Sequence, residues 1–318
     1  MNTEIVSIPI ADPCLALPTT CPDHCVTLTV RLINLAAIVI PFLGLIAVPF
    51  FVWGWGFNWV DLGLMLAMYF ITVLGITVGY HRLFTHRSFE TNIVVKFILA
   101  VLGSMAVEGP LLKWVATHRR HHQYSDQAED PHSPNQHGGG AWSVIRGVWH
   151  AHIGWMFQAD SKKLGLYVKD LEKSRALRIA SKLFPLWVAM GLLIPAVLGG
   201  ILTNSWKGFT TGLVWGGLVR IFLVHHVTWS INSACHLWGS RPFHSGDDSR
   251  NNAVFGYLAL GEGWHNTHHA FPTSARHGLR WWQFDLSYWV IQALAAFGFA
   301  WNVYVPNETT LSQKRREP

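Results

Sequence analysis

Long stretches without a charged residue constrain this chain more than any other feature of its sequence. No Asp, Glu, Lys or Arg occurs in residues 32–53, 62–80 or 183–206. A helix of about 20 apolar residues crosses the roughly 30 Å hydrocarbon core of a bilayer. A further apolar stretch from residue 208 contains Arg220, His225 and His226, so its far half is expected to face protein. We therefore predict four spanning helices, at about 32–53, 60–80, 183–204 and 208–230.

The composition agrees with a membrane protein. Half of the residues are hydrophobic and 13% are charged, against about 25% charged in typical soluble domains. The 17 Trp suit a membrane–water interface, where an apolar ring with one polar N–H is stable. A chain this apolar is not disordered. Its net charge of +6 favours contact with anionic lipid and argues against a nucleic-acid partner.

The polar segments between the spans predict a cap on one membrane face. Residues 81–182 contain 14 Lys and Arg and the segment from 237 contains seven, whereas the short turns contain only Lys207. Because basic segments stay in the cytoplasm, we expect the cap and both termini there. The predicted fold is an all-α integral membrane protein with four transmembrane helices. It forms a single domain over residues 31–305, with a cytosolic helical cap from 81–182 and 237–305.

Two tails flank this domain, a flexible one over residues 1–30 and a basic one over 306–318. The first contains Cys14, Cys21 and Cys25, with His24 between the last two. A zinc site there is one alternative, but no second ligand pair lies nearby, so we expect reduced thiols in a loose tail.

The 18 histidines, as many as Asp and Glu together, fall mostly in clusters. Positions i, i+3 and i+4 share one helix face, so an H-x-x-H-H group aims three imidazoles at one point. Two such groups occur, together with an H-x-x-x-x-H pair at the end of the second span. His236 lies at the same predicted membrane level, in line with Asn232 on the fourth span. The clustered histidines are His81, His86, His118, His121, His122, His236, His265, His268 and His269.

Nine neutral imidazoles exceed what one metal ion can bind, but suit two ions with four or five nitrogens each and an open position. Two irons bound in this way beside lipid would suit oxygen activation against an acyl chain. Six further histidines lack partners at ligand spacing and are expected to be solvated or packed: His132, His137, His150, His152, His244 and His277. His225 and His226 lie deeper in the fourth span and are expected to be structural or to support the ligands. Glu262 and Asp130 are candidates for orienting ligand imidazoles, with helix capping or turn formation as the alternative.

These clusters, in this order, resemble the membrane-bound fatty acid desaturases of the delta-9 type. The similarity covers roughly residues 60–280 and is closest to bacterial and cyanobacterial members. It includes five further motifs: Gly75-Ile-Thr-Val-Gly-Tyr-His81, Asp130-Pro-His132, His152-Ile-Gly-Trp155, Asn232-Ser-Ala-Cys-His236 and Gly261-Glu-Gly-Trp-His265.

The resemblance implies that the nine histidines hold two Fe²⁺ ions and that Asn232 reaches one of them through water. It also implies O2-dependent introduction of a cis double bond into the acyl chain of a lipid or acyl-CoA. Trp114 and Trp229 match family positions that can line a tunnel mouth. Met65 and Tyr69, three to four turns below His81, are expected to close the tunnel, with plain helix packing as the alternative.

Two rival functions fit part of this pattern. A hydroxylase of the same superfamily would return a hydroxyl group to the acyl chain instead of removing a second hydrogen. A metal transporter would place its sites near the bilayer midplane, whereas these clusters lie at span ends and in loops.

The carrier of the acyl chain and the source of electrons are two further expectations. Animal acyl-CoA enzymes have Arg-Asp before the second cluster and Arg-Lys after His-x-Gly-Trp. The matching residues here are Ala116, Thr117, Ala159 and Asp160, although Lys162 and Lys163 follow closely. The substitutions favour an acyl-lipid over acyl-CoA, because phosphate recognition usually needs Arg or Lys. Without a ferredoxin-like cysteine set or a His-Pro-Gly-Gly sequence, electrons are expected from a separate ferredoxin or small haem cytochrome.

Overall fold

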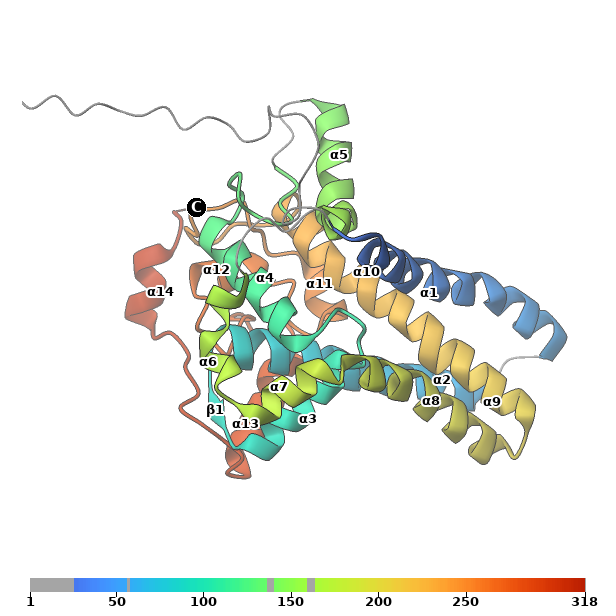
Figure 1. The fold of residues 1–318 in the computed structure, drawn as a ribbon. Coiled ribbons are helices and arrows are strands. Elements are labelled where there is room, and N and C mark those ends of the chain that lie inside the picture. Colours follow the sequence, from blue (N-terminus) through green and yellow to red (C-terminus); the bar gives the residue numbers. More distant parts are fainter. Residues whose placement is uncertain (1–25, 56–57, 136–139, 159–163, 318) are drawn as a thin grey trace, which may run out of the picture.

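The computed structural model describes residues 26–55, 58–135, 140–158 and 164–317, without side-chain detail for 51–55. The tail cysteines, His24 and His137 lie outside the described residues. Helices dominate this part of the chain, and one short antiparallel pair joins β1 (Glu90–Thr91) to β2 (Ala300–Trp301). Figure 1 shows long helices on the right and a group of shorter helices on the left, which includes α14 near the C-terminus.

Four helices of the described residues are long and apolar enough to cross a membrane, as predicted. They cover Leu28–Phe50, Trp59–Thr85, Phe184–Thr203 and Trp206–His236. The first belongs to α1 (Leu28–Trp55), the second consists of α2 (Trp59–Leu74) and the π-helical η2 (Gly75–Thr85), and the third is α8 (Phe184–Thr203). The fourth joins α9 (Trp206–Gly212), the π-helical η5 (Leu213–Val219), α10 (Arg220–Ser233) and η6 (Ala234–His236).

The second and fourth spans run further than the charge-free stretches that locate them in the sequence. The second continues past Arg82 and the fourth passes through Arg220, and both side chains are fully buried. A helix continues through a charged residue when protein groups replace water around that charge. The extended end of the second span includes His81, and the fourth span ends at His236.

The remaining elements form what we call the cap. Between the second and third spans lie β1, α3 (Ile93–Ser104), α4 (Leu111–Tyr124), α5 (Ala141–His152), η3 (Gly154–Phe157), η4 (Leu164–Tyr167), α6 (Lys169–Glu172) and α7 (Arg175–Lys182). After the fourth span come α11 (Ala253–Leu258), α12 (His265–Ala270), α13 (Leu286–Ala296), β2 and α14 (Glu308–Lys314).

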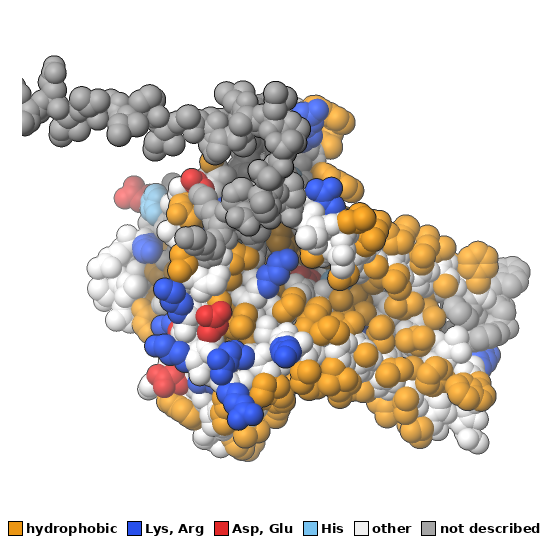
Figure 2. Space-filling view, viewed as in Figure 1, with side chains coloured by type: hydrophobic (Ala, Val, Ile, Leu, Met, Phe, Trp, Pro, Cys, Tyr) orange, Lys and Arg blue, Asp and Glu red, His pale blue; other side chains and the backbone are white. Residues whose placement is uncertain are grey.

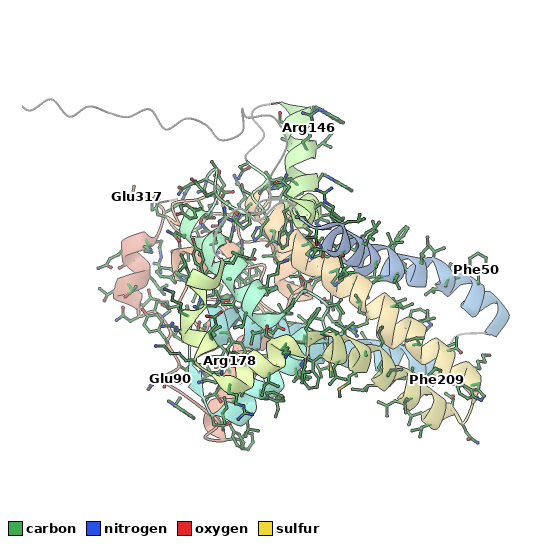
Figure 3. All side chains as sticks on the ribbon, viewed as in Figure 1. Phe50, Glu90, Arg146, Arg178, Phe209 and Glu317 are labelled. Atoms are coloured by element: carbon green, nitrogen blue, oxygen red, sulfur yellow. The ribbon has the colours of Figure 1, made fainter. Side chains whose placement is uncertain are left out.

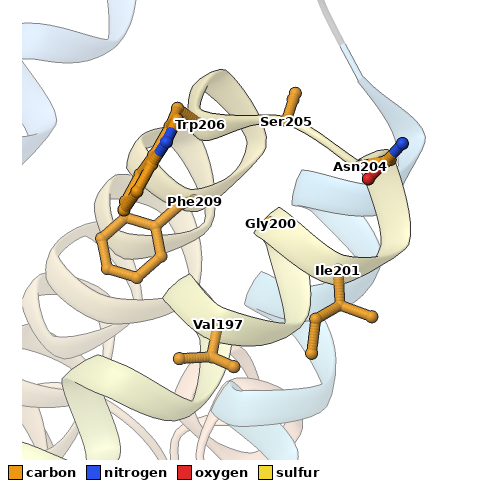
Figure 4. A pocket seen from close by; sticks show the side chains of 7 residues that line it. All are labelled: Val197, Gly200, Ile201, Asn204, Ser205, Trp206 and Phe209. Carbon is orange, nitrogen blue, oxygen red and sulfur yellow. The ribbon is translucent and has the colours of Figure 1, made fainter.

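The turn between α8 and α9 is set by local side-chain chemistry. Asn204 adopts a left-handed conformation with φ of 48°, and the Ser205 hydroxyl caps α9 by accepting from the Gly208 amide at 3.0 Å. A pocket of about 370 Å³ lies at this turn, lined by residues that include Val197, Ile201 and Trp206 (Figure 4). Since Trp206 and His236 are opposite ends of one span, this pocket is remote from the histidines.

Arg220 ties three helical segments together inside the bundle. Its guanidinium donates to the carbonyl oxygens of Met105 after α3 (2.6 Å), Gly191 on α8 (2.9 Å) and Gly216 on η5 (3.1 Å). An ionised group in a membrane bundle is costly unless its donors are bonded. We therefore assign Arg220 a structural role.

The second span packs directly on α3 through a pair of glycines. A Cβ atom on Gly75 would overlap the backbone of Leu102 and Gly103, and one on Gly103 would overlap the ring of Tyr80. Close backbone approach through small residues is a common way for membrane helices to pack. This contact holds η2, which carries His81, against the cap.

We predict that Gly75→Ala destabilises the protein, because the added methyl group forces η2 away from α3. Overpacking of this kind costs about 1–3 kcal/mol, which corresponds to a melting temperature several degrees lower. Thermal unfolding of the detergent-solubilised protein measures the change. Gly63→Ala on the same span is the matched control, since apart from its chain neighbours and its own helix backbone no atom of the described residues lies within 4 Å of the position that its Cβ would take. Equal melting temperatures for the two variants would contradict the packing argument.

Candidate metal centre

All nine clustered histidines come together in the structure, in two groups. The five-histidine group consists of His81, His86, His118, His122 and His268, and the four-histidine group consists of His121, His236, His265 and His269. Within each group, one ring nitrogen of every member lies within 4.8 Å of the others.

Two short helices contribute to both groups. On α4, His118 and His122 belong to the five-histidine group and His121 to the other. On α12, His268 belongs to the five-histidine group, whereas His265 and His269 belong to the other. Side chains of consecutive helix residues point about 100° apart, so the two adjacent histidines of an H-x-x-H-H segment face different groups. The expectation that each H-x-x-H-H segment aims all three imidazoles at one point is therefore wrong, and the shared helices make the two groups neighbours.

The approach of the ring nitrogens fits metal binding. The Nε2 atoms of His81 and His268 are 3.1 Å apart, as are those of His236 and His265, and His122 and His268 approach to 2.9 Å. Nitrogens that share a metal ion at about 2 Å lie about 3–4 Å from each other. The buried Nε2 atoms of His86, His121 and His269 have no hydrogen-bond partner among the described residues. Convergent, partnerless imidazole nitrogens suit a borderline-soft metal such as iron.

Carboxylates contact the Nδ1 atoms of three members of the four-histidine group, on the side of each ring away from the converging nitrogens. His121 Nδ1 lies 2.9 Å from Asp130, His236 Nδ1 lies 2.9 Å from Asp126, and His269 Nδ1 lies 2.5 Å from Asp247. A carboxylate only accepts hydrogen bonds, so each Nδ1 carries the proton and each Nε2 keeps its lone pair. Sequence reasoning named Asp130 but missed Asp126 and Asp247, which lie in loops without a recognisable spacing.

Glu262 orients His81 in the five-histidine group, with its Oε2 2.6 Å from His81 Nδ1. Arg82 fixes this carboxylate from the other side, with Nη2 3.0 Å from Glu262 Oε1 and Nη1 2.9 Å from Asp285. His277 Nδ1 lies 3.3 Å from Glu262 Oε2. Gly261, with φ of 121°, allows this approach because a Cβ there would overlap Asp285. Sequence reasoning did not identify Arg82 and Asp285 and expected no partner for His277.

Burial keeps six of these imidazoles neutral at neutral pH. Burial lowers the pKa of five of them well below the ordinary value, and neighbouring imidazoles lower it further. These five are His86, His118, His122, His265 and His268. Burial lowers the pKa of His269 to about 4, although Asp247 opposes this shift. Neutral imidazole is the form that binds metal, so these six side chains can bind a metal ion at neutral pH without first losing a proton.

The acids behind the four-histidine group remain ionised. Burial raises the pKa of Asp126, Asp130 and Asp247, but hydrogen bonds and charge from their histidines outweigh burial and hold each pKa below its ordinary value. Each carboxylate therefore stays an acceptor at neutral pH.

The other predicted site residues lie around these groups. Asn232 is partly buried on α10, four residues before His236. Trp114 stacks on His118 with ring centroids 5.0 Å apart, and Trp229 stacks on His225 at 4.6 Å. Met65 is buried on α2, and the Tyr69 hydroxyl donates to the Leu258 carbonyl at 2.8 Å.

The remaining described histidines differ in their surroundings. His244 is exposed, and His150 is buried. His132 lies beside His121, with ring centroids 4.4 Å apart. His225 lies 3.2 Å from the Val107 carbonyl, and His152 lies between His226 (3.0 Å) and the Ser233 hydroxyl (3.1 Å).

Comparison with known proteins identifies similar chains. The family model described as fatty acid desaturase matches residues 57–305. A hex-5-enoyl-acyl-carrier-protein acetylenase of Moorena producens is 42% identical over 279 residues, 87% of each chain. An sn-1 stearoyl-lipid 9-desaturase of Anabaena variabilis is 41% identical, covering 78% of this chain and 85% of the relative. An acyl-CoA C20 delta-5-desaturase of Anemone leveillei is 39% identical, covering 79% and 76% respectively.

We predict that His265→Ala selectively empties the four-histidine group. Removing one of four ligands should lower the iron content of the purified protein from about two ions to about one per chain and abolish activity. Elemental analysis measures the iron. His244→Ala is the control, because His244 is exposed and belongs to neither group. Unchanged iron content in His265→Ala would refute the ligand assignment.

We also predict that Asp247→Asn weakens metal retention without removing a ligand. Loss of the carboxylate behind His269 should lower metal affinity roughly 10–100-fold. The rate at which a chelator extracts iron provides the measurement. Asp248→Asn is the matched control, since the neighbouring Asp248 carboxylate pairs with Arg241 instead. Equal extraction rates for the two variants would mean that Asp247 does not support the site.

Proposed function

Because this chain belongs to the fatty acid desaturase family, we propose that it introduces a cis double bond, at the delta-9 position, into a saturated acyl chain carried by a membrane lipid. Family membership makes the protein an oxidoreductase that desaturates fatty acyl chains, which removes the transporter alternative. The observation that carries the proposal is the convergence of nine imidazoles in two groups at the ends of apolar spans.

The two histidine groups would each hold one iron, with Asn232 reaching one of them through water. Iron bound there supplies the O2 chemistry needed to remove hydrogen from an unactivated methylene. Overall, two hydrogens leave the acyl chain and combine with two electrons and two protons to reduce O2 to two water molecules.

The chain's own residues then have two tasks. The carboxylates of Asp126, Asp130 and Asp247 hold Nδ1 protons and fix their rings, so that the Nε2 lone pairs are preorganised. Glu262 packs against His81 Nδ1 at 2.6 Å and limits the movement of that ring. The surrounding protein fixes which methylene of the acyl chain is presented and keeps bulk water away. Trp114 and Trp229, which stack beside His118 and His225, are proposed to line the entrance for the acyl chain.

The position of the double bond and the accepted length of the acyl chain depend on how far that chain can enter the tunnel. The named relatives include a lipid 9-desaturase and an acyl-CoA delta-5-desaturase, so relatives of similar identity differ in position. We propose delta-9 from the combined motifs and from the lipid 9-desaturase relative. Met65 and Tyr69 are proposed to close the far end, where the Tyr69 hydroxyl joins α2 to α11.

An acyl-lipid carrier is supported by the residues around the second cluster. Ala116 and Thr117, buried on α4, offer no cation for a coenzyme phosphate. The nearby Arg119 is engaged by Asp170 at 2.7 Å and by the carbonyls of Phe84 and Tyr167. Ala159, Asp160, Lys162 and Lys163, which were also compared with the animal acyl-CoA enzymes, lie outside the described residues.

Electrons are proposed to come from a separate acidic protein, a ferredoxin or a small haem cytochrome, on the cytoplasmic side. Figure 2 shows Lys and Arg side chains over the cap, while the spans present mainly hydrophobic side chains on this face. Within the cap, Lys173 directly after α6 and Arg175 and Arg178 on α7 are exposed. The positive charge supports both a cytoplasmic cap and attraction of an acidic donor.

Direct competition tests the proposal. Purified, iron-loaded enzyme in lipid nanodiscs receives its electron donor system and O2, with a stearoyl glycerolipid and stearoyl-CoA supplied together. We expect a cis-9 alkene on the glycerolipid, located by mass spectrometry of the derivatised products. His121→Ala, which loses a predicted ligand, should form no product.

Each other product would overturn one part of the proposal. Conversion of the CoA ester with none of the lipid would refute the carrier, and a double bond elsewhere would refute the position. A hydroxylated acyl chain would favour the hydroxylase alternative. An alkyne would match the chemistry named for the Moorena producens relative.

A further inference from the structure

The helix α5 exposes a continuous apolar face that no other described element covers. Trp142, Ile145 and Trp149 are spaced i, i+3 and i+7, which places them on one side of a helix. They are 63%, 56% and 63% exposed, respectively. The opposite side of α5 is buried, including Gly147 and His150. A water-exposed helix does not normally leave two Trp and one Ile in this arrangement.

Hydrogen bonds fix the level of α5 relative to the spans. Directly after α5, the Met156 carbonyl accepts from Asn34 Nδ2 at 2.8 Å, and Asn34 lies near the start of α1. At the end of α5, His152 approaches His226 and Ser233 on α10, at 3.0 and 3.1 Å. The end of α5 is therefore held beside the cap-side ends of two spans.

The direction of α5 differs from that of the spans. In Figure 1, α5 stands at the top with its lower end near the ends of α1 and α10, and it runs across their direction instead of alongside them. Since spanning helices cross a bilayer, a helix that runs across their direction at the level of their ends lies along the bilayer surface. The apolar side chains of α5 and α1 also form neighbouring patches in Figure 2.

Arg146 adds a cation at the edge of this apolar face. Its guanidinium lies 5.6 Å from the centre of the Trp142 ring, and its side chain extends outward from α5 (Figure 3). Trp at the headgroup level and Arg beside lipid phosphates are the usual arrangement of an interfacial amphipathic helix.

We propose that α5 lies flat in the membrane–water interface, with Trp142, Ile145 and Trp149 among the lipid acyl chains and Arg146 at the level of the lipid phosphates. The apolar face of α5 then continues the lipid-contacting surface of α1. The occupant of this face is the bilayer, not a protein partner. The inference depends on the membrane location of the chain and not on its proposed substrate.

Spin labels on α5 test this proposal in protein reconstituted in nanodiscs. The labels are attached at Ile145→Cys and, separately, at Trp149→Cys. The background replaces Cys14, Cys21 and Cys25 by Ser and keeps the buried Cys235. Power saturation compares collision of the label with O2, which concentrates in lipid, and with a water-soluble nickel complex. Leu43→Cys on α1 is the lipid control and Thr309→Cys on α14 is the water control.

We expect both α5 labels to show an O2-to-nickel collision ratio several-fold above that at Thr309 and approaching that at Leu43. Ratios equal to that at Thr309 would place α5 in water and overturn the proposal. Low collision with both reagents, together with spin–spin broadening, would indicate a contact between two copies of the chain and would also overturn it. Melting temperatures of the labelled variants should match that of the background protein.

Discussion

The orientation of the imidazoles depends on hydrogen bonds at the ring nitrogens that point away from the two groups. Asp126, Asp130 and Asp247 each accept such a hydrogen bond from an Nδ1 atom within 3 Å. The Glu262 carboxylate makes an ion-pair contact instead, 2.6 Å from His81 Nδ1. A buried imidazole that lacks this partner can flip or change tautomer, and its lone pair then leaves the site. The loops that carry these acids are held in turn by backbone contacts, such as the Asp248 amide that donates to Asp126 at 2.8 Å.

Much of this architecture follows from patterns local to the sequence. Spans appear as uncharged stretches of sufficient length, and H-x-x-H-H places three imidazoles on one helical turn. The ends of the second and fourth spans were less predictable. The charge of Arg82 marks the apparent end of the second span until its buried partners are known, and the fourth span continues past residue 230 to His236. The π-helical geometry of η2 and η5 could not be predicted either, because the spacing of apolar and charged residues does not distinguish a π-helix from an α-helix.

The supporting residues of the site were only partly predictable, because their partners are distant in sequence. Asp126 contacts His236 across 110 positions, and Arg82 contacts Glu262 across 180. Asp130 and Glu262 were identified because they lie within motifs, whereas Asp247 follows a Ser-Gly pair that indicates only a turn. Which acid faces which histidine is decided by the tertiary fold. The same holds for the apolar face of α5, whose exposure depends on what packs against it.

The distribution of acids makes the two histidine groups electrostatically unequal. Among the described residues, three carboxylates contact the four-histidine group, whereas the five-histidine group has only Glu262, whose charge is shared with Arg82. In a poorly screened interior, each uncompensated negative charge lowers the energy of a nearby cation. With an iron in each group, as proposed, the protein field would favour the more highly charged ion at the four-histidine group. Two iron ions bound by histidine alone would therefore differ in reduction potential.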